Sequence, residues 1–169
     1  MLRCTLHDGL NFSKYPDYPM TIRWHCIAFE SFPPLILYDV LRLRSEVFVV
    51  EQNCAFQDID RQDLDAYHLL GYNEAGELAA YARLFDAGKS YAEASIGRVI
   101  VAAPYRSFGL GRELMRQALL HSDALFGPQP NKIGAQQHLE AFYNGFGYEQ
   151  CGPMYVEDGI PHIPMLRRA

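Results

Sequence analysis

The sequence predicts a single α/β domain built around a mixed sheet, and three observations support this fold class. The chain has 169 residues, 49% of them apolar and 13% aromatic, which is enough to fill one compact core. Some segments alternate apolar and polar residues with the period of a strand, whereas others repeat apolar residues every three or four positions. These two kinds of segment alternate along the chain, and the sequence shows no internal repeat and no linker to a second domain.

Turn and capping residues separate the expected elements. Pro33 and Pro34 open the first helix, residues 73–77 turn a hairpin, and Gly127 with Pro128 ends the long second helix. The expected strands lie at 21–29, 68–72, 78–85, 93–101, 132–135, 148–151 and 162–166. The expected helices lie at 35–50, 109–125 and 136–148. Residues 1–19 follow neither period, so we expect a flexible extension before a domain that spans 20–169.

The turn between the strand at 93–101 and the helix at 109–125 is the most informative segment. It reads Arg106-Ser107-Phe108-Gly109-Leu110-Gly111. Its two glycines let the backbone approach a ligand closely, and the free N–H groups and positive dipole end of the following helix attract an anion. Arg106 adds a fixed positive charge. The turn therefore predicts a phosphate-binding site.

The spacing within this turn argues against two other nucleotide sites. A dinucleotide fold requires a third glycine where Leu114 stands, and an acidic residue for the ribose is missing near 131–135. A Walker loop requires Lys and Ser or Thr directly after the second glycine, where this chain has Arg112 and Glu113.

A second block follows downstream. Residues 133–135 end a short strand, and 136–148 then place apolar residues at helical spacing before Gly147, a typical helix end. The apolar positions are Leu139, Phe142, Tyr143 and Phe146.

These two blocks resemble motifs A and B of the GNAT superfamily of acetyl-coenzyme A dependent N-acetyltransferases. Motif A is Arg/Gln-x-x-Gly-x-Gly/Ala after a strand, and motif B is Phe-Tyr-x-x-x-Gly-Phe/Tyr. Further segments are similar to the ElaA-like members of this superfamily, and the resemblance spans about 20–167. These segments are 43–60, 97–99, 134–136 and 157–162. The resemblance implies the GNAT fold, in which two central strands splay apart and open a slot for the pantetheine arm.

The resemblance also implies roles for individual residues. Main-chain groups of the motif A strand would bind the pantetheine amides as an added strand does, and the turn would bind the diphosphate. The expected coenzyme-binding residues are Val99, Ile100, Val101, Arg106, Ser107, Phe108, Gly109, Leu110, Gly111, Arg112 and Gln136. Tyr143 matches the family tyrosine that protonates the departing thiolate, a role that suits a phenol with a pKa of about 10.

The general base is less well indicated. Ser95 stands where some family members have a catalytic glutamate, and Gln136 replaces a common asparagine. Candidates for the base or the acceptor pocket are Glu51, Asp58, Asp60, His68, His138 and His162. Most single histidines are structural and most aspartate clusters are solvated loops. We favour His138 and His162, because both border the expected slot.

The resemblance implies direct transfer of acetyl from acetyl-CoA to a primary amine in a ternary complex, without a metal. Two alternatives stay open: a CoA-binding regulatory module without catalysis, and an acyltransferase like the acyl-homoserine-lactone synthases. The sequence leaves open whether the amine belongs to a small molecule or a peptide, and whether the chain forms a homodimer.

Composition excludes several other classes of protein. The formal net charge is −5, and no block of lysine and arginine is present, which argues against nucleic-acid binding and favours a positively charged amine as acceptor. The four cysteines are too scattered for zinc or a redox pair. No segment reads as a membrane span or a signal peptide, so we expect a cytoplasmic protein without membrane contact.

Overall fold

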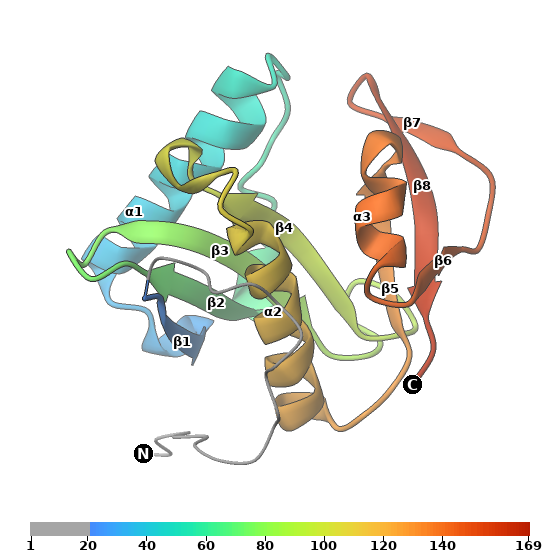
Figure 1. Cartoon of the computed structure of the whole chain (residues 1–169), viewed down its shortest axis with the longest axis horizontal. Coiled ribbons are helices and arrows are strands. Elements are labelled where there is room, and N and C mark those ends of the chain that lie inside the picture. The colour runs from blue at the N-terminus through green and yellow to red at the C-terminus, as the bar shows by residue number, and fades with distance from the viewer. Residues whose placement is uncertain (1–20) are drawn as a thin grey trace.

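The computed structural model describes residues 21–169 as two antiparallel sheets with three α-helices (Figure 1). The predicted extension at 1–19 lies outside the described residues. The first sheet has the order β1-β2-β3-β4. Its strands are β1 (Arg23–Ala28), β2 (Tyr67–Tyr72), β3 (Leu78–Phe85) and β4 (Ser95–Val101).

The second sheet is formed by the C-terminal part of the chain. Its central strand β8 pairs with β5 and β6 on its two sides, and β7 pairs with the beginning of β8. The strands are β5 (Asn131–Gln136), β6 (Tyr148–Gln150), β7 (Tyr155–Glu157) and β8 (Ile160–Arg167). The strand β7 was not predicted, because its three residues are exposed and show no alternation.

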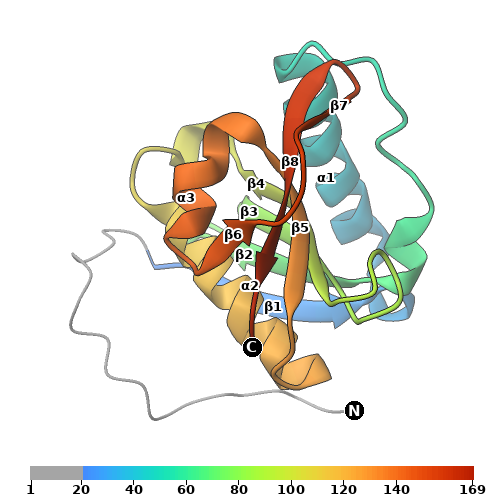
Figure 2. The same cartoon turned by 90° about the vertical axis from the view of Figure 1, so that its right-hand side faces the viewer.

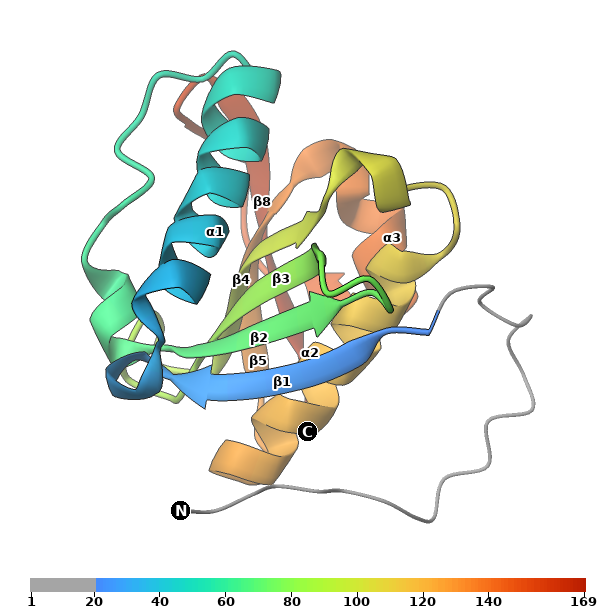
Figure 3. The ribbon, with the colours of Figure 1, turned by 90° about the vertical axis from the view of Figure 1, so that its left-hand side faces the viewer.

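Two helices cover opposite faces of the first sheet (Figure 3). On one face α1 (Pro34–Arg44) packs on a cluster that contains Leu70 and Tyr81. On the other face α2 (Leu110–Phe126) packs on Leu69 and Leu84, in a larger cluster that continues into the second sheet. Consecutive strand residues point to opposite faces, so neighbouring leucines are both buried here because the sheet is covered on both sides.

Two helical predictions need correction. The expected helix at 35–50 is regular only to Arg44 and continues as a π-helical turn over Ser45–Glu51. The expected helix at 136–148 is a 3₁₀ turn at Gln137–Leu139 followed by the short α3 (Glu140–Asn144). The helix ends at Asn144 with Gly145 as its C-cap, and Gly147, the predicted helix end, lies beyond it in the following turn with a φ of +83°. Further 3₁₀ turns lie at Phe29–Ser31, Gln62–Asp65 and Ala103–Tyr105.

The junction of the two sheets positions the site. Within 21–169 the sheets are joined by one parallel bridge between Ala94 and Asn131, next to which the Lys132 N–H donates to the Ala94 carbonyl at 2.8 Å. From this bridge β4 and β5 run in the same direction and diverge (Figure 2). The predicted splaying of the central strands is therefore confirmed. None of the helices in this part of the chain is long and apolar enough to cross a bilayer.

Candidate active site

A cavity of about 870 Å³ lies between the diverging strands β4 and β5. Its walls come from β4, β5 and β8, from the beginning of α2, from α3, and from the segment around 47–62. Of the predicted coenzyme-binding residues, those that line it are Val99, Ile100, Val101, Arg106, Gly111 and Gln136. The predicted catalytic residues Tyr143, His138 and His162 line it as well. Ser107, Phe108, Gly109 and Leu110 form the turn that leads to Gly111, and Arg112 follows in α2. No group of three or more metal-ligating side chains occurs within residues 21–169.

The turn before α2 has the backbone conformation expected of an anion site. Gly109 is the N-cap residue of α2 with a φ of +82°, a conformation that side chains disfavour. The N–H groups of Arg112 and Glu113 both donate to the Gly109 carbonyl. The N–H groups of the five preceding residues, 107–111, donate to no acceptor in the described part of the chain. These groups are available to an anion at the positive end of the helix dipole.

Arg106 is engaged within the protein. Its Nε donates to the Val101 carbonyl at 2.9 Å, and its two terminal nitrogens bind the Glu51 carboxylate at 2.6 and 2.9 Å. The hydrogen bond from Arg106 lowers the pKa of Glu51, which makes this carboxylate a weaker base. Arg106 thus ties the turn to β4 and to the π-helical turn, and much of its charge is balanced.

Tyr143 lies on α3 with its side chain largely buried. Its ring packs edge-on against Phe142 and Tyr148, at centroid distances of 5.1 and 6.0 Å. Burial raises the pKa of Tyr143 to about 12, because the phenolate would lose its hydration. The hydroxyl therefore carries its proton at neutral pH, as a general acid must.

His162 has one ring nitrogen committed and one available. Its Nδ1 lies 2.8 Å from the Ile160 carbonyl, which can only accept, so Nδ1 carries a proton, and in the neutral ring Nε2 then has the lone pair. The ring stacks on Tyr155 at 5.7 Å. In the β5–β8 register His162 lies opposite Gln136, so the two polar side chains expected near the slot are neighbours.

Two contacts connect the walls of the cavity. The Gln136 amide donates to the Gln52 side-chain oxygen at 3.3 Å. The Cys54 thiol donates to the Asp158 carbonyl at 3.3 Å. Both join the segment after α1 to the second sheet.

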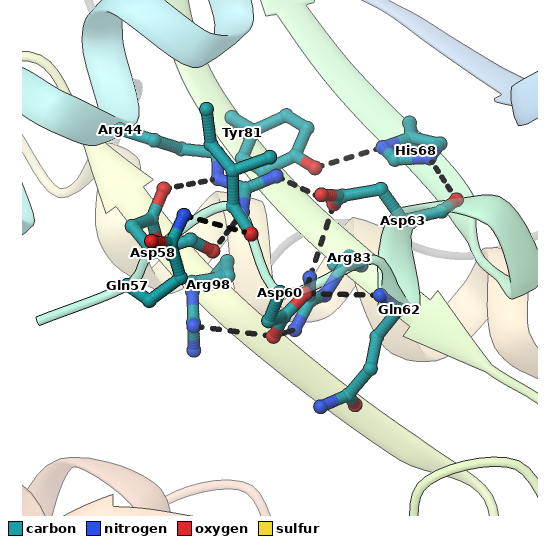
Figure 4. Close-up of polar contacts among 11 residues, drawn as sticks. Arg44, Gln57, Asp58, Asp60, Gln62, Asp63, His68, Tyr81, Arg83 and Arg98 are labelled. Atoms are coloured by element: carbon teal, nitrogen blue, oxygen red, sulfur yellow. Dashed lines mark hydrogen bonds and ion pairs between the residues drawn. The ribbon is translucent and has the colours of Figure 1, made fainter.

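The aspartates at 58, 60 and 63 belong to a buried ion-pair cluster rather than to a solvated loop (Figure 4). Each of them binds two of the three arginines 44, 83 and 98, and all of the nitrogen–oxygen distances lie between 2.5 and 3.4 Å. Burial alone would raise the pKa of Asp63, but its hydrogen bonds and charge contacts with Arg44 and Arg83 outweigh burial and lower it. Sequence reasoning missed the arginines, although Arg83 and Arg98 each interrupt an apolar run, which is a signal of a buried ion pair.

His68 is part of this cluster and not of the cavity. It is fully buried, and its ring nitrogens lie 2.8 Å from the Tyr81 hydroxyl and 3.0 Å from the Asp63 carbonyl. Asp58 is likewise buried against Arg44 and Arg98. Both are poorly placed for a base at the cavity. Asp60 lines the cavity but is paired with Arg83 and Arg98.

The buried His68 predicts a loss of stability in mild acid. Burial lowers its pKa in the folded protein below the ordinary value of about 6.5. Between these two pKa values the unfolded chain binds more protons than the folded protein. The contribution of His68 to the free energy of unfolding is therefore fully present above pH ~6.5 and is lost as the pH drops. Denaturant titrations between pH 7 and 5 should show this slope, and His68→Gln should reduce it by at most about 1.4 kcal/mol per pH unit. Burial also lowers the pKa of His121, so this residue contributes to the pH dependence that remains in the variant. If His68→Gln has the same pH dependence as wild type, His68 does not cause the loss of stability.

Comparisons with known proteins agree with this architecture. The family model of the acetyltransferase (GNAT) domain matches residues 42–168. The ElaA protein of Escherichia coli is 42% identical over 148 residues, which cover 86% of this chain and 96% of that protein. Its crystal structure superposes with a TM-score of 0.81 at 41% identity, over 88% of this chain and 100% of the other. The crystal structure of an acyl-CoA N-acyltransferase from Pseudomonas aeruginosa gives a TM-score of 0.80 at 40% identity, over 86% and 99% of the two chains. With these matches and the split between β4 and β5, the chain belongs to the GNAT acetyltransferase family and, within it, is an ElaA-like protein.

Proposed function

We propose that this protein transfers an acetyl group from acetyl-CoA to a primary amine while both substrates are bound. The observation that carries the proposal is the cavity between β4 and β5, which has unpaired N–H groups beside one end and the protonated Tyr143 hydroxyl in its wall. Membership of the GNAT family supplies the reaction class.

The residues present fit the coenzyme. The unpaired N–H groups of 107–111 would hold its diphosphate. The edge of β4 that faces the second sheet has no strand partner beyond the bridge at Ala94 in the described chain, so its main chain near 99 and 100 is open to the pantetheine amides, whereas the Val101 carbonyl already accepts from Arg106. The coenzyme would then lie along β4, with its acyl end near the middle of the strand.

In the proposed reaction the neutral amine nitrogen attacks the thioester carbonyl carbon. The new carbon–nitrogen bond forms, the carbon–sulfur bond breaks, and the thiolate takes the proton of the Tyr143 hydroxyl. The amine proton goes to Nε2 of His162, which keeps a free lone pair because Nδ1 is committed to Ile160. The protein contributes positioning, exclusion of water and these two proton transfers.

A calorimetric titration with acetyl-CoA, followed by an assay of thiol release over a panel of amines, amino acids and peptides, tests the proposal. We expect saturable binding and thiol release that depends on the amine. Binding without release across the panel would instead favour the non-catalytic CoA-binding module.

The Gly109→Val substitution should weaken acetyl-CoA binding by on the order of tenfold. A β-branched residue disfavours the φ of +82°, at a cost of about 1–2 kcal/mol, so the turn must change its conformation. The matched control is Gly76→Val in the β2–β3 hairpin, where φ is +81° and the position is equally open. It should lower stability comparably without changing the Kd for acetyl-CoA, and an unchanged Kd in the Gly109 variant would refute the anion site.

A further inference from the structure

Arg98 occupies a special position in the wall of the cavity. It lies in β4 with a φ of +49°, where the β3–β4 register shifts, and its side chain lines the cavity. A residue with a side chain in this conformation costs about 1–2 kcal/mol relative to glycine. Backbone strain of this kind clusters at functional sites, so its place beside a cavity indicates a role for the Arg98 side chain.

The guanidinium of Arg98 is fixed in place and yet has one free nitrogen. Its plane lies near the rings of Phe48 and Phe56, at 5.6 and 5.5 Å. Its Nε donates to Asp58 at 2.7 Å, and its Nη2 contacts Asp60 at 3.4 Å. No residue in the described part of the chain bonds Nη1, and 24% of the side chain is exposed. Figure 4 shows Arg98 at the edge of the ion-pair cluster, away from Tyr81 and His68.

The place of Arg98 along β4 relates it to the proposed acyl end of the coenzyme. The turn at 107–111 follows the carboxyl end of β4, and an arm that runs back along the strand passes Val101, Ile100 and Val99 in that order. Arg98 is the next residue. A group bound to Nη1 would therefore lie beside the acyl carbon, where the acceptor must sit.

The opposite wall carries negative charge. Glu157 and Asp158 line the cavity and are exposed, and neither forms an ion pair with a described residue. The other carboxylates of the lining, Glu51 and Asp60, are bound by arginines. The cavity thus offers a free guanidinium nitrogen on β4 and, at the β7–β8 turn, two carboxylates that no described cation binds, of which Glu157 is hydrogen-bonded to Tyr155.

We propose, on the basis of the proposed function, that the acceptor is an amino carboxylate whose carboxylate binds Arg98. Its amine, a few bonds away, would enter as the ammonium past Glu157 and Asp158, release one proton to solvent, and reach the acyl carbon as the neutral amine. A guanidinium suits a carboxylate because its planar edge presents directed N–H donors. The acceptor would thus carry a carboxylate in addition to the positively charged amine that the net charge of the protein predicts.

Thiol release with matched pairs of acceptors tests this inference. The probes are glycine, leucine, phenylalanine, glutamate and lysine, each beside its α-carboxamide, at saturating acetyl-CoA. The carboxamides have the less basic amines, so chemistry alone favours them at neutral pH. We expect the best acid to exceed its amide by roughly 10- to 100-fold in kcat/KM, the effect of one charge-assisted hydrogen bond.

Arg98→Met should abolish this preference by lowering kcat/KM for the acid and not for the amide, chiefly through KM. Arg98→Lys keeps the charge but loses the planar guanidinium, so it should retain part of the preference. If the methionine variant does not fold, the lysine variant still tests the inference. The matched control is Arg42→Met, which removes an exposed arginine paired with Glu46 and should leave the preference unchanged.

The outcomes separate this inference from the proposed function. Two results would overturn the inference and leave acetyl transfer intact. In the first, the amides are acetylated with a kcat/KM equal to or above that of the acids. In the second, the preference for the acid persists in both Arg98 variants. If no probe is acetylated, calorimetry of the N-acetyl amino acids and their amides on CoA-loaded protein decides. Binding of the acids that requires Arg98 would support the carboxylate site, and absence of binding would overturn it, while acetyl transfer is judged on the wider amine panel.

Discussion

Tyr143→Phe should lower kcat by about 10²- to 10⁴-fold while the Kd for acetyl-CoA stays nearly constant. The substitution removes one oxygen from a ring whose packing against Phe142 and Tyr148 is unchanged. The thiolate would then have to leave without a proton from the enzyme. Steady-state thiol release and calorimetry on the same preparation give the two quantities.

Tyr148→Phe is the matched control for this experiment. Tyr148 is also buried, and its hydroxyl donates to the Asn131 side chain at 2.7 Å outside the cavity lining. Its loss should lower the free energy of unfolding by about 1 kcal/mol and leave kcat unchanged. Equal turnover of wild type and Tyr143→Phe, or an equal loss in both variants, would remove the acid role of Tyr143.

Asp63→Asn should lower the free energy of unfolding by about 3–5 kcal/mol. The Asp63 carboxylate accepts from Arg44 at 2.5 Å and from Arg83 at 3.0 Å in a nearly dry environment. Without its charge, three arginines share two carboxylates, and a buried cation is left without full compensation. Chemical denaturation followed by circular dichroism measures the change.

A neighbouring aspartate provides the control for this loss of stability. Asp65 pairs with Lys89 at 2.9 Å, but both side chains are about half exposed. Exposed ion pairs contribute about 0–1 kcal/mol, so Asp65→Asn should have little effect. A similarly small effect at Asp63 would show that the cluster does not stabilise the fold.

Local patterns were sufficient for most of the fold. The apolar run of β3, the turn before it and the amphipathic α2 are each encoded within a short stretch of chain. The π-helical turn at Ser45–Glu51 was missed because its apolar residues continue the pattern of α1, and only the backbone hydrogen bonds distinguish it. The strand β7 was missed because it pairs at the edge of a sheet through its main chain.

The site divides in the same way. The turn at 107–111 before α2 and the position of Tyr143 in the cavity wall follow from contiguous motifs, while the roles expected of them stay predictions. The ion-pair cluster was not, because its partners are separated by 14 to 40 residues and meet only after the sheet has formed. The assignment of the free nitrogen of His162 needed the main chain at Ile160, which sequence spacing does not place.

The bridge between Ala94 and Asn131 has a mechanical consequence. It sets the width of the gap between the sheets at its narrow end, and the Gln136–Gln52 and Cys54–Asp158 contacts tie the two sides together further along. The width of the gap is therefore fixed at more than one place before a ligand enters. A guest wider than this gap has to break one of these two hydrogen bonds.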